Sequence, residues 1–177
     1  MRLFIAVDLT NSVKEQLKTI IKDFAAIRGL RFIEPEDSHL TLLFIGESND
    51  QEKIKKLLEQ INFESFSIET DKLGYFEHQN RLKVFWLGFA KSNELNALQK
   101  QIRDLLPFVE SDHNQFNPHL TIARANPDVD ASRLKEKILR YEVPVLCINV
   151  YSVKLYSSVL QNGKPKYALL AKIDVKK

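Results

Sequence analysis

The chain carries one short motif, His-x-Thr-x, twice. The first copy is His-Leu-Thr-Leu at residues 39–42 and the second is His-Leu-Thr-Ile at residues 119–122, and the 177 residues contain only four histidines. Alternate side chains of a β-strand share one face. Read as a strand, each copy points one imidazole and one hydroxyl the same way. Two such strands facing each other would surround a small anion with two proton-transfer groups and two hydrogen-bond donors.

Hydrolysis of a phosphodiester needs such a set of groups. A base must take a proton from water on one side of phosphorus, and an acid must protonate the departing oxygen on the other. Histidine suits both roles because its unperturbed pKa is ~6.5. The hydroxyls of Thr41 and Thr121 can donate to the non-bridging oxygens as negative charge builds. His39 and His119 are therefore the candidate catalytic residues, in a mechanism that needs no metal.

Two other interpretations of the histidines stay open in the sequence. Each ring could lie in the core with its nitrogens bonded to the backbone, although the duplicated context favours catalysis. A zinc site usually needs three or four protein ligands. Asp37 could join His39 in such a site, but the residue at the equivalent place before His119 is Asn117. We therefore expect no metal and no cofactor.

The similarity between the two halves extends beyond the motif, which suggests an internal repeat of about 80 residues. Apolar runs precede each motif, amphipathic helical patterns flank it, and an alternating strand pattern ends each half. The matching segments, first half before second, are the runs 3–7 and 84–88, helices with apolar residues at 13–24 and 95–106, helices 51–60 and 131–140, and strands 65–76 and 145–156. This order predicts an α+β protein.

The domain organisation follows from the repeat. We expect a single domain over residues 1–177, with the repeat units roughly at 1–80 and 81–177 and a junction between lobes in the polar stretch 77–82. Asn162-Gly163 between two strand patterns predicts a terminal β-hairpin. The only cysteine, Cys147, lies in an apolar strand pattern and is expected to be buried.

Composition limits the class of protein. The net charge of +3 and pI of about 8.9 suit a phosphate-bearing ligand but do not by themselves indicate nucleic-acid binding. No apolar stretch approaches the ~18 residues that span a bilayer, and the first ten residues do not look like a signal peptide. We therefore expect a cytoplasmic protein away from membranes, and a monomer.

The chain resembles the two-histidine phosphoesterase superfamily, and within it the RNA 2′,3′-cyclic phosphodiesterases, historically called 2′-5′ RNA ligases. The resemblance covers nearly the whole chain and implies a bilobal α+β fold, in which two pseudo-two-fold related lobes of antiparallel sheet with outer helices surround a central cleft. The residues that carry it are both His-x-Thr-x motifs, the opening residues 1–7, Gly46, the segment 116–124, and the ending 155–160 with Gly163 and Tyr167.

The resemblance also implies an activity and residue roles. The activity is metal-independent opening of a 2′,3′-cyclic phosphate at an RNA end to a 2′-phosphate. His39 would be the proton donor at the leaving 3′ oxygen and His119 the proton acceptor, while Thr41, Thr121 and Arg124 would bind the phosphate. The symmetry of the motifs alone does not say which histidine is the acid.

Arg124 raises a geometric problem. It lies five residues after His119, so strict alternation puts it on the opposite face of the strand. The strand must end or bulge near Ala123 for Arg124 to reach the site. Its equivalent in the first repeat is Phe44, so the site would not be fully symmetric.

The substrate also leaves alternatives. Unpaired RNA is recognised by stacking of bases on aromatic rings, and Phe32, Phe44 and Phe116 are the nearest candidates, although each could equally be a core residue. The expected partners are RNAs with 2′,3′-cyclic phosphate ends, tRNA fragments among them, or small cyclic nucleotides. 2′-5′ oligonucleotides as substrates, reversible 2′-5′ ligation, and a non-catalytic RNA-binding module remain open.

Overall fold

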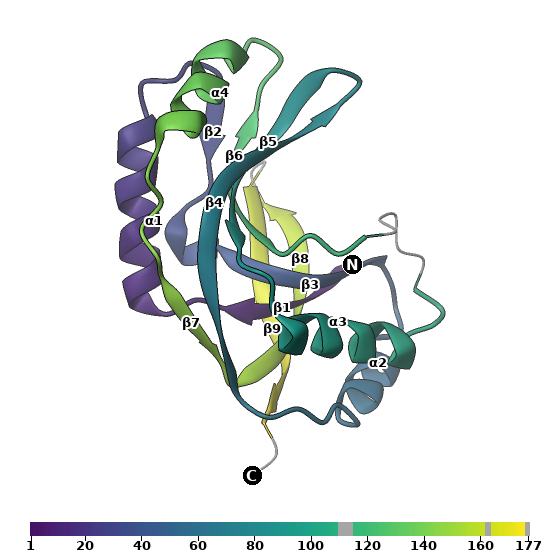
Figure 1. Cartoon of the computed structure of the whole chain (residues 1–177). Helices are drawn as coiled ribbons and strands as arrows, with labels where there is room; N and C mark the ends of the chain where they lie inside the picture. The colour runs from purple at the N-terminus through teal and green to yellow at the C-terminus, as the bar shows by residue number, and fades with distance from the viewer. Residues whose placement is uncertain (110–114, 162–163, 176–177) are drawn as a thin grey trace.

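Two antiparallel sheets form the frame of the protein, in a computed structural model that describes residues 1–109, 115–161 and 164–175 (Figure 1). One sheet has the strand order β3-β1-β8-β9 and the other β2-β6-β5-β4-β7. The strands are β1 (Arg2–Asp8), β2 (Leu30–Phe32), β3 (His39–Glu47), β4 (Phe66–His78), β5 (Arg81–Phe89), β6 (His119–Ala125), β7 (Cys147–Val150), β8 (Ser152–Gln161) and β9 (Lys164–Asp174). The predicted α+β fold is confirmed.

The helices bury one apolar stripe each, as the sequence spacing predicts. In α1 the residues Val13, Leu17, Ile20 and Phe24 are buried, each three or four positions after the last. The helices of the described residues are α1 (Asn11–Phe24), α2 (Gln51–Leu58), α3 (Asn93–Leu105) and α4 (Ala131–Arg140), with a short 3₁₀ helix at Pro35–Asp37. None of them is long and apolar enough to cross a membrane.

The helices form two pairs, one on each sheet. Figure 1 shows α1 beside α4 on the five-stranded sheet, and α2 beside α3 next to β3. The ring of Phe24 in α1 packs 4.7 Å from that of Phe85 in β5. In α3, Gln99 donates to the carbonyl oxygen of Leu42 in β3 at 3.4 Å. Each helix pair thus takes one helix from each sequence repeat.

The strands are exchanged between the repeats in the same way. The last strand of the first repeat, β4, pairs with β5 of the second. The corresponding strand of the second repeat, β8, pairs with β1 of the first. Each sheet therefore contains strands from both halves of the sequence. This exchange ties the two sheets together and fixes the strands that carry the histidines relative to each other.

The stretch 77–82, predicted as the junction between lobes, is instead the tight turn of the β4–β5 hairpin within one sheet. Gln79 and Asn80 have φ of 50° and 58°, as a type I′ hairpin turn requires. The prediction was right about a turn and wrong about a boundary. The predicted terminal hairpin is present as β8 and β9, with Gln161 paired to Lys164; Asn162 and Gly163 lie outside the described residues.

Two further predictions near the end of the second repeat were wrong. The stretch 145–156 is not one strand, because it divides around Tyr151 into β7, which pairs with β4, and β8, which pairs with β1. Cys147 is exposed rather than buried. In β7 the alternation places Ile148 and Val150 in the core, so Cys147 lies on the outer face. The short strand β2 was not predicted at all.

Candidate active site

The two histidines begin two strands, β3 and β6, that lie against each other across the sheets. Nδ1 of His39 bonds to the carbonyl oxygen of Asp37 at 2.8 Å, and Nδ1 of His119 bonds to that of Asn117 at 2.7 Å. A carbonyl can only accept, so Nδ1 carries the hydrogen in both rings. This bond fixes the tautomer and directs proton exchange to Nε2.

A β-bulge follows the threonine in each motif. Along β6 the partners step from Thr121, opposite Trp86, to Ala123, opposite Phe85, so Ile122 is the extra residue. Along β3 the equivalent extra residue is Leu42. A bulge reverses the alternation of faces beyond it. Two successive residues are consequently buried in each strand, and the residue after them turns back to the face of the histidine and threonine.

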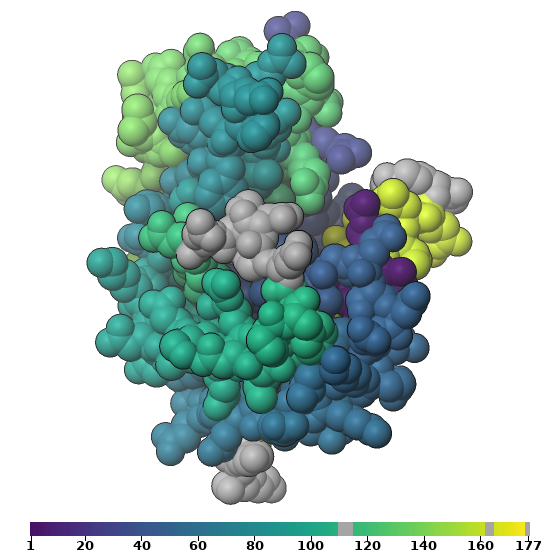
Figure 2. Space-filling view, turned by 90° about the vertical axis from the view of Figure 1, so that its right-hand side faces the viewer, coloured from purple at the N-terminus to yellow at the C-terminus, as the bar shows by residue number. Residues whose placement is uncertain are grey.

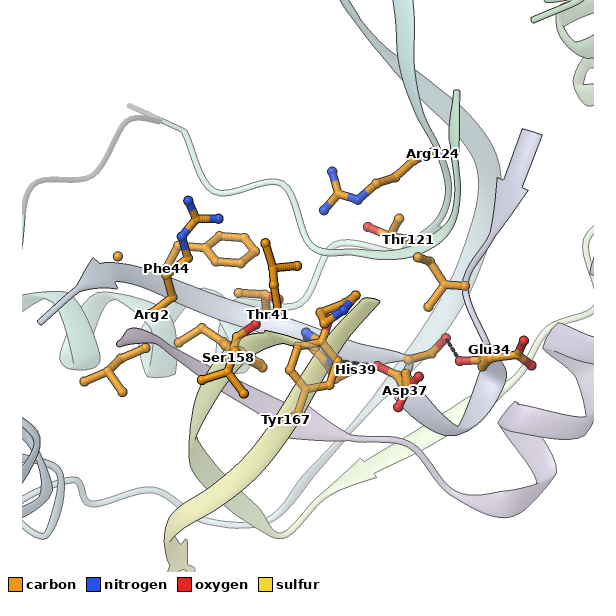
Figure 3. A pocket seen from close by; sticks show the side chains of 18 of the residues that line it. Arg2, Glu34, Asp37, His39, Thr41, Phe44, Thr121, Arg124, Ser158 and Tyr167 are labelled. Carbon is orange, nitrogen blue, oxygen red and sulfur yellow. Dashed lines mark hydrogen bonds between the residues drawn. The ribbon is translucent and has the colours of Figure 1, made fainter. Parts of the chain in front are cut away.

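The bulge explains how Arg124 reaches the site. Ala123 is fully buried, and Arg124 lies on the same side as Thr121. Figure 3 shows the guanidinium of Arg124 and the hydroxyl of Thr121 on one side of the pocket. The predicted bulge near Ala123 is thus present. Its equivalent in β3 turns Phe44 to the cleft in the same manner.

A cleft of about 870 Å³ lies between the two sheets and contains both motifs. Figure 2 shows the molecule hollowed there, between the upper teal and green segments on one side and the purple N-terminal segment and the yellow β8–β9 hairpin on the other. The predicted residues that line the cleft are His39, His119, Thr41, Thr121, Arg124, Phe32 and Phe44. The structure therefore brings together all but one of the residues singled out in the sequence.

The stacking candidates are placed differently. Phe44 is 59% exposed at the cleft wall, so a base could lie on its ring. Phe32 is half-buried and also lines the cleft. Phe116 packs against the hydrophobic core and is not among the cleft-lining residues. Phe44 is accordingly the best-placed aromatic of the three.

We call His39 with its neighbours on β1, β8 and β9 the His39 half-site. The imidazole stacks on Phe4 with 4.6 Å between ring centroids and meets the edge of Tyr167 at 5.2 Å. Burial lowers the pKa of His39 below its ordinary 6.5, and the charge of His119 acts in the same direction. The bond to Asp37 and the carboxylates of Asp8 and Asp37 oppose this decrease.

Asp8 of β1 lies directly opposite His39 in the β1–β3 ladder. Its carboxylate accepts a hydrogen bond from the Tyr156 hydroxyl at 2.7 Å and forms an ion pair with Lys154. Burial would raise the pKa of Asp8, but the bonds from Lys154 and Tyr156 outweigh it and lower the pKa. Asp8 therefore stays negatively charged next to His39 at neutral pH.

We call His119 with its neighbours on β4, β5 and β6 the His119 half-site, and its described neighbours on β4 and β5 are two aromatic rings and a glycine. Phe76 meets the imidazole edge-on at 4.9 Å, and the Trp86 ring centroid lies 6.3 Å away. Gly88 takes the place opposite His119 that Asp8 takes opposite His39. The indole fills the space beside Gly88, since a Cβ on that residue would lie 2.7 Å from the Trp86 ring. Among the described residues, the cross-strand place that Asp8 takes beside His39 is thus filled by a residue without a carboxylate.

Arg31, Tyr167 and Phe4 also line the cleft, and none of them was identified from sequence as a site residue. Arg31 lies in β2, whose three residues are too few for a periodic pattern. Tyr167 and Phe4 occur in segments that carry the family resemblance, but their role depends on contacts between distant strands.

In the described parts of the chain, no three His, Cys, Asp or Glu residues cluster so that they could hold a metal ion.

Comparison with known proteins agrees with this geometry. The model of the 2′-5′ RNA ligase superfamily matches residues 14–159. The chain belongs to this superfamily. A Thermotoga maritima protein named RNA 2′,3′-cyclic phosphodiesterase is 33% identical over 177 residues, which cover 96% of this chain and 93% of the relative. One of the same name from Archaeoglobus fulgidus is 33% identical over 135 residues, covering 73% and 77%.

Solved structures agree at the level of the fold. E. coli LigT in apo form superposes with a TM-score of 0.78 at 26% identity, covering 99% of this chain and 98% of LigT. LigT complexed with 3′-AMP gives a TM-score of 0.80 at 23% identity over the same shares. The family and the fold predicted from sequence are confirmed, and the predicted enzyme class agrees with the names of the relatives.

Proposed function

We propose that this superfamily member opens RNA 2′,3′-cyclic phosphates to 2′-phosphates without a metal. The observation that carries the proposal is the pair of imidazoles in one cleft, each held by an Nδ1 bond and each followed by a threonine on the same face. Two such groups supply a base and an acid on opposite sides of phosphorus. The names of the relatives support the same activity.

The reaction can be written with these residues. Nε2 of His119 takes a proton from water, the water oxygen attacks phosphorus, and the P–O3′ bond breaks. Nε2 of His39 gives its proton to O3′, so the phosphate stays on O2′. Thr41, Thr121 and Arg124 would donate to the non-bridging oxygens, whose negative charge increases in the transition state. Two proton transfers leave the pair in reversed protonation states, which exchange with solvent restores.

The charges around the site support this assignment of roles. Asp8 and Asp37 favour the protonated form of His39, as a proton donor requires. Burial lowers the pKa of His39, but a bound phosphodiester would add a negative charge beside the ring and raise this pKa again. Arg124 lies in the strand of His119, so its positive charge is on the side of the proposed base.

The test is product analysis on a short RNA that ends in a 2′,3′-cyclic phosphate, with EDTA present. We expect full conversion to a 2′-phosphate end at the rate seen without EDTA. Activity that disappears with chelator and returns with a divalent ion would overturn the mechanism. A parallel panel of cyclic mononucleotides and 2′-5′ oligonucleotides separates the alternative substrates, and binding without turnover of any of them would indicate a non-catalytic RNA-binding module.

A further inference from the structure

We infer that Arg31 and Arg124 together form a second anion subsite in the cleft, which binds the phosphodiester on the 5′ side of the terminal nucleotide. The inference rests on the proposed function and specifies its substrate: an RNA chain end rather than a free cyclic mononucleotide. Arg124 is then shared between the reacting phosphate and the next one along the chain, and Arg31 serves the latter alone.

The first observation is the register of β2 and β6. Arg31 lies directly opposite Arg124 in this antiparallel ladder. Directly opposed residues project to the same face of a sheet, with Cβ atoms about 4.5–5.5 Å apart. Both side chains line the cleft that contains the histidines. Two guanidinium groups are thus brought to one place by the strand pairing itself.

The second observation is that neither arginine of this pair is neutralised by a described residue. Neither arginine forms an ion pair or a side-chain hydrogen bond within the described parts of the chain. Glu34 and Asp37 also line the cleft, but neither is paired with Arg31 or Arg124. Like charges directly opposite each other destabilise a sheet. An anion bound between the two guanidinium groups would remove this repulsion.

The position of Arg31 indicates which anion binds there. Arg124 lies on β6, the strand of His119. Arg31 lies on the edge strand β2 beside it, about one strand spacing, ~4.8 Å, from β6. The reacting phosphate is expected beside Thr121 and within reach of Arg124. A cyclic mononucleotide carries no second phosphate. An RNA end carries one through O5′ of the terminal ribose, and a guanidinium suits it because its N–H groups can bond two phosphate oxygens.

The test compares two dinucleotides that end in the same nucleoside 2′,3′-cyclic phosphate. One has a normal phosphodiester linkage and the other an uncharged methylphosphonate linkage, so the bases are identical and one charge differs. For the wild-type protein at low salt, we expect kcat/KM to favour the charged linkage about tenfold, the effect of one charge-assisted hydrogen bond at an exposed site. In Arg31→Gln this preference should fall to about twofold or less.

The matched control is Arg28→Gln, which removes the same charge from an exposed arginine near β2 that does not line the cleft; it should keep the wild-type preference. A wild-type protein indifferent to the charge of the linkage, or a preference that survives in Arg31→Gln, would overturn the subsite while leaving the proposed activity intact. Failure of both substrates to open would instead contradict the proposed function.

Discussion

The His39 and His119 half-sites share one backbone arrangement. In both, the histidine begins its strand and its Nδ1 bonds to a carbonyl two residues earlier. In both, a threonine follows on the same face, and a bulge at Leu42 or Ile122 then reverses the alternation. Placing two imidazoles on either side of one cleft is therefore a property of the repeated backbone, and it does not depend on the residues around them.

The surrounding side chains differ at nearly every equivalent place. Asp8 lies opposite His39 where Gly88 lies opposite His119. Beyond the bulges, the ring of Phe44 in β3 corresponds to the guanidinium of Arg124 in β6. A carboxylate, itself paired with Lys154, therefore lies opposite His39, whereas a guanidinium lies in the strand of His119. The backbone thus supplies two equivalent imidazoles, and the difference in charge beside them supports the proposed division of the proton-transfer roles.

Removing either histidine should have the largest effect, and a similar one in both half-sites. We expect His39→Ala and His119→Ala each to lower kcat about 10²–10⁴-fold, the usual contribution of general acid or base catalysis. Because both act in one step, the double variant should lose little more than the worse single variant. Thermal unfolding of each variant checks that the fold persists, and His39→Gln provides a larger replacement for the ring that packs on Phe4. Wild-type kcat in either variant would remove that histidine from the chemistry.

Replacing the threonines tests the same symmetry, with a smaller expected loss of kcat. Thr41→Val and Thr121→Val each remove one donor to the developing charge and should lower kcat by about 10²-fold with little change in KM. The controls are Thr41→Ser and Thr121→Ser, which keep the hydroxyl and should retain most activity. An effect confined to one half-site would show that only one threonine contacts the phosphate.

Replacing Phe44 should affect substrate binding rather than the chemical step, unlike replacing Arg124, its equivalent in the second repeat. Stacking of a base on an aromatic ring is worth about 1–3 kcal/mol, so Phe44→Leu should raise KM for an RNA substrate about tenfold and leave kcat nearly unchanged. Phe116→Leu is the control, since that ring packs on the core; it should alter thermal stability rather than KM. A drop in kcat for Phe44→Leu would contradict a stacking role.

Asp8 should shift the pH profile by a smaller amount. The proton donor must be protonated, and burial lowers the pKa of His39, so kcat/KM should fall as pH rises through a value below 6.5. For kcat the same limb should lie at higher pH, because the bound phosphodiester raises the pKa. Asp8→Asn removes a favourable charge and should move the kcat/KM limb about 0.5 pH unit lower.

The control for Asp8 is Asp104→Asn, which removes an exposed carboxylate on α3 that is paired with Lys100. It should leave the pH profile in place. A limb that moves to higher pH in Asp8→Asn would contradict the role assigned to this carboxylate.

Local patterns in the sequence were enough to predict the helices, the motif strands and the need for a bulge before Arg124. The exchange of strands between the repeats was not predictable in this way, because alternation shows which residues share a face but not which strand pairs with which. The same limit explains the division around Tyr151 and the exposure of Cys147. The monomeric state and the cytoplasmic location stay predictions.

The candidate site residues also divide into those visible in a local sequence pattern and those that depend on strand pairing. His39, His119 and both threonines could be identified because a repeated motif is visible without knowing the fold. Asp8 and Arg31 could not be identified, because each is placed at the site by its cross-strand partner. Asp8 lies opposite His39 in the β1–β3 ladder, and Arg31 lies opposite Arg124 in the β2–β6 ladder.

The most direct test of the division of roles uses a substrate whose leaving atom needs no acid. In a 2′,3′-cyclic phosphate with sulfur in place of O3′, the leaving group is a thiolate, stable near neutral pH because a thiol has a pKa of about 8.5. The measurement is the rate of this substrate relative to the normal one in His39→Ala and His119→Ala. We predict that sulfur restores most activity to His39→Ala and little to His119→Ala. Rescue of His119→Ala instead would show that the acid and base have been assigned the wrong way round.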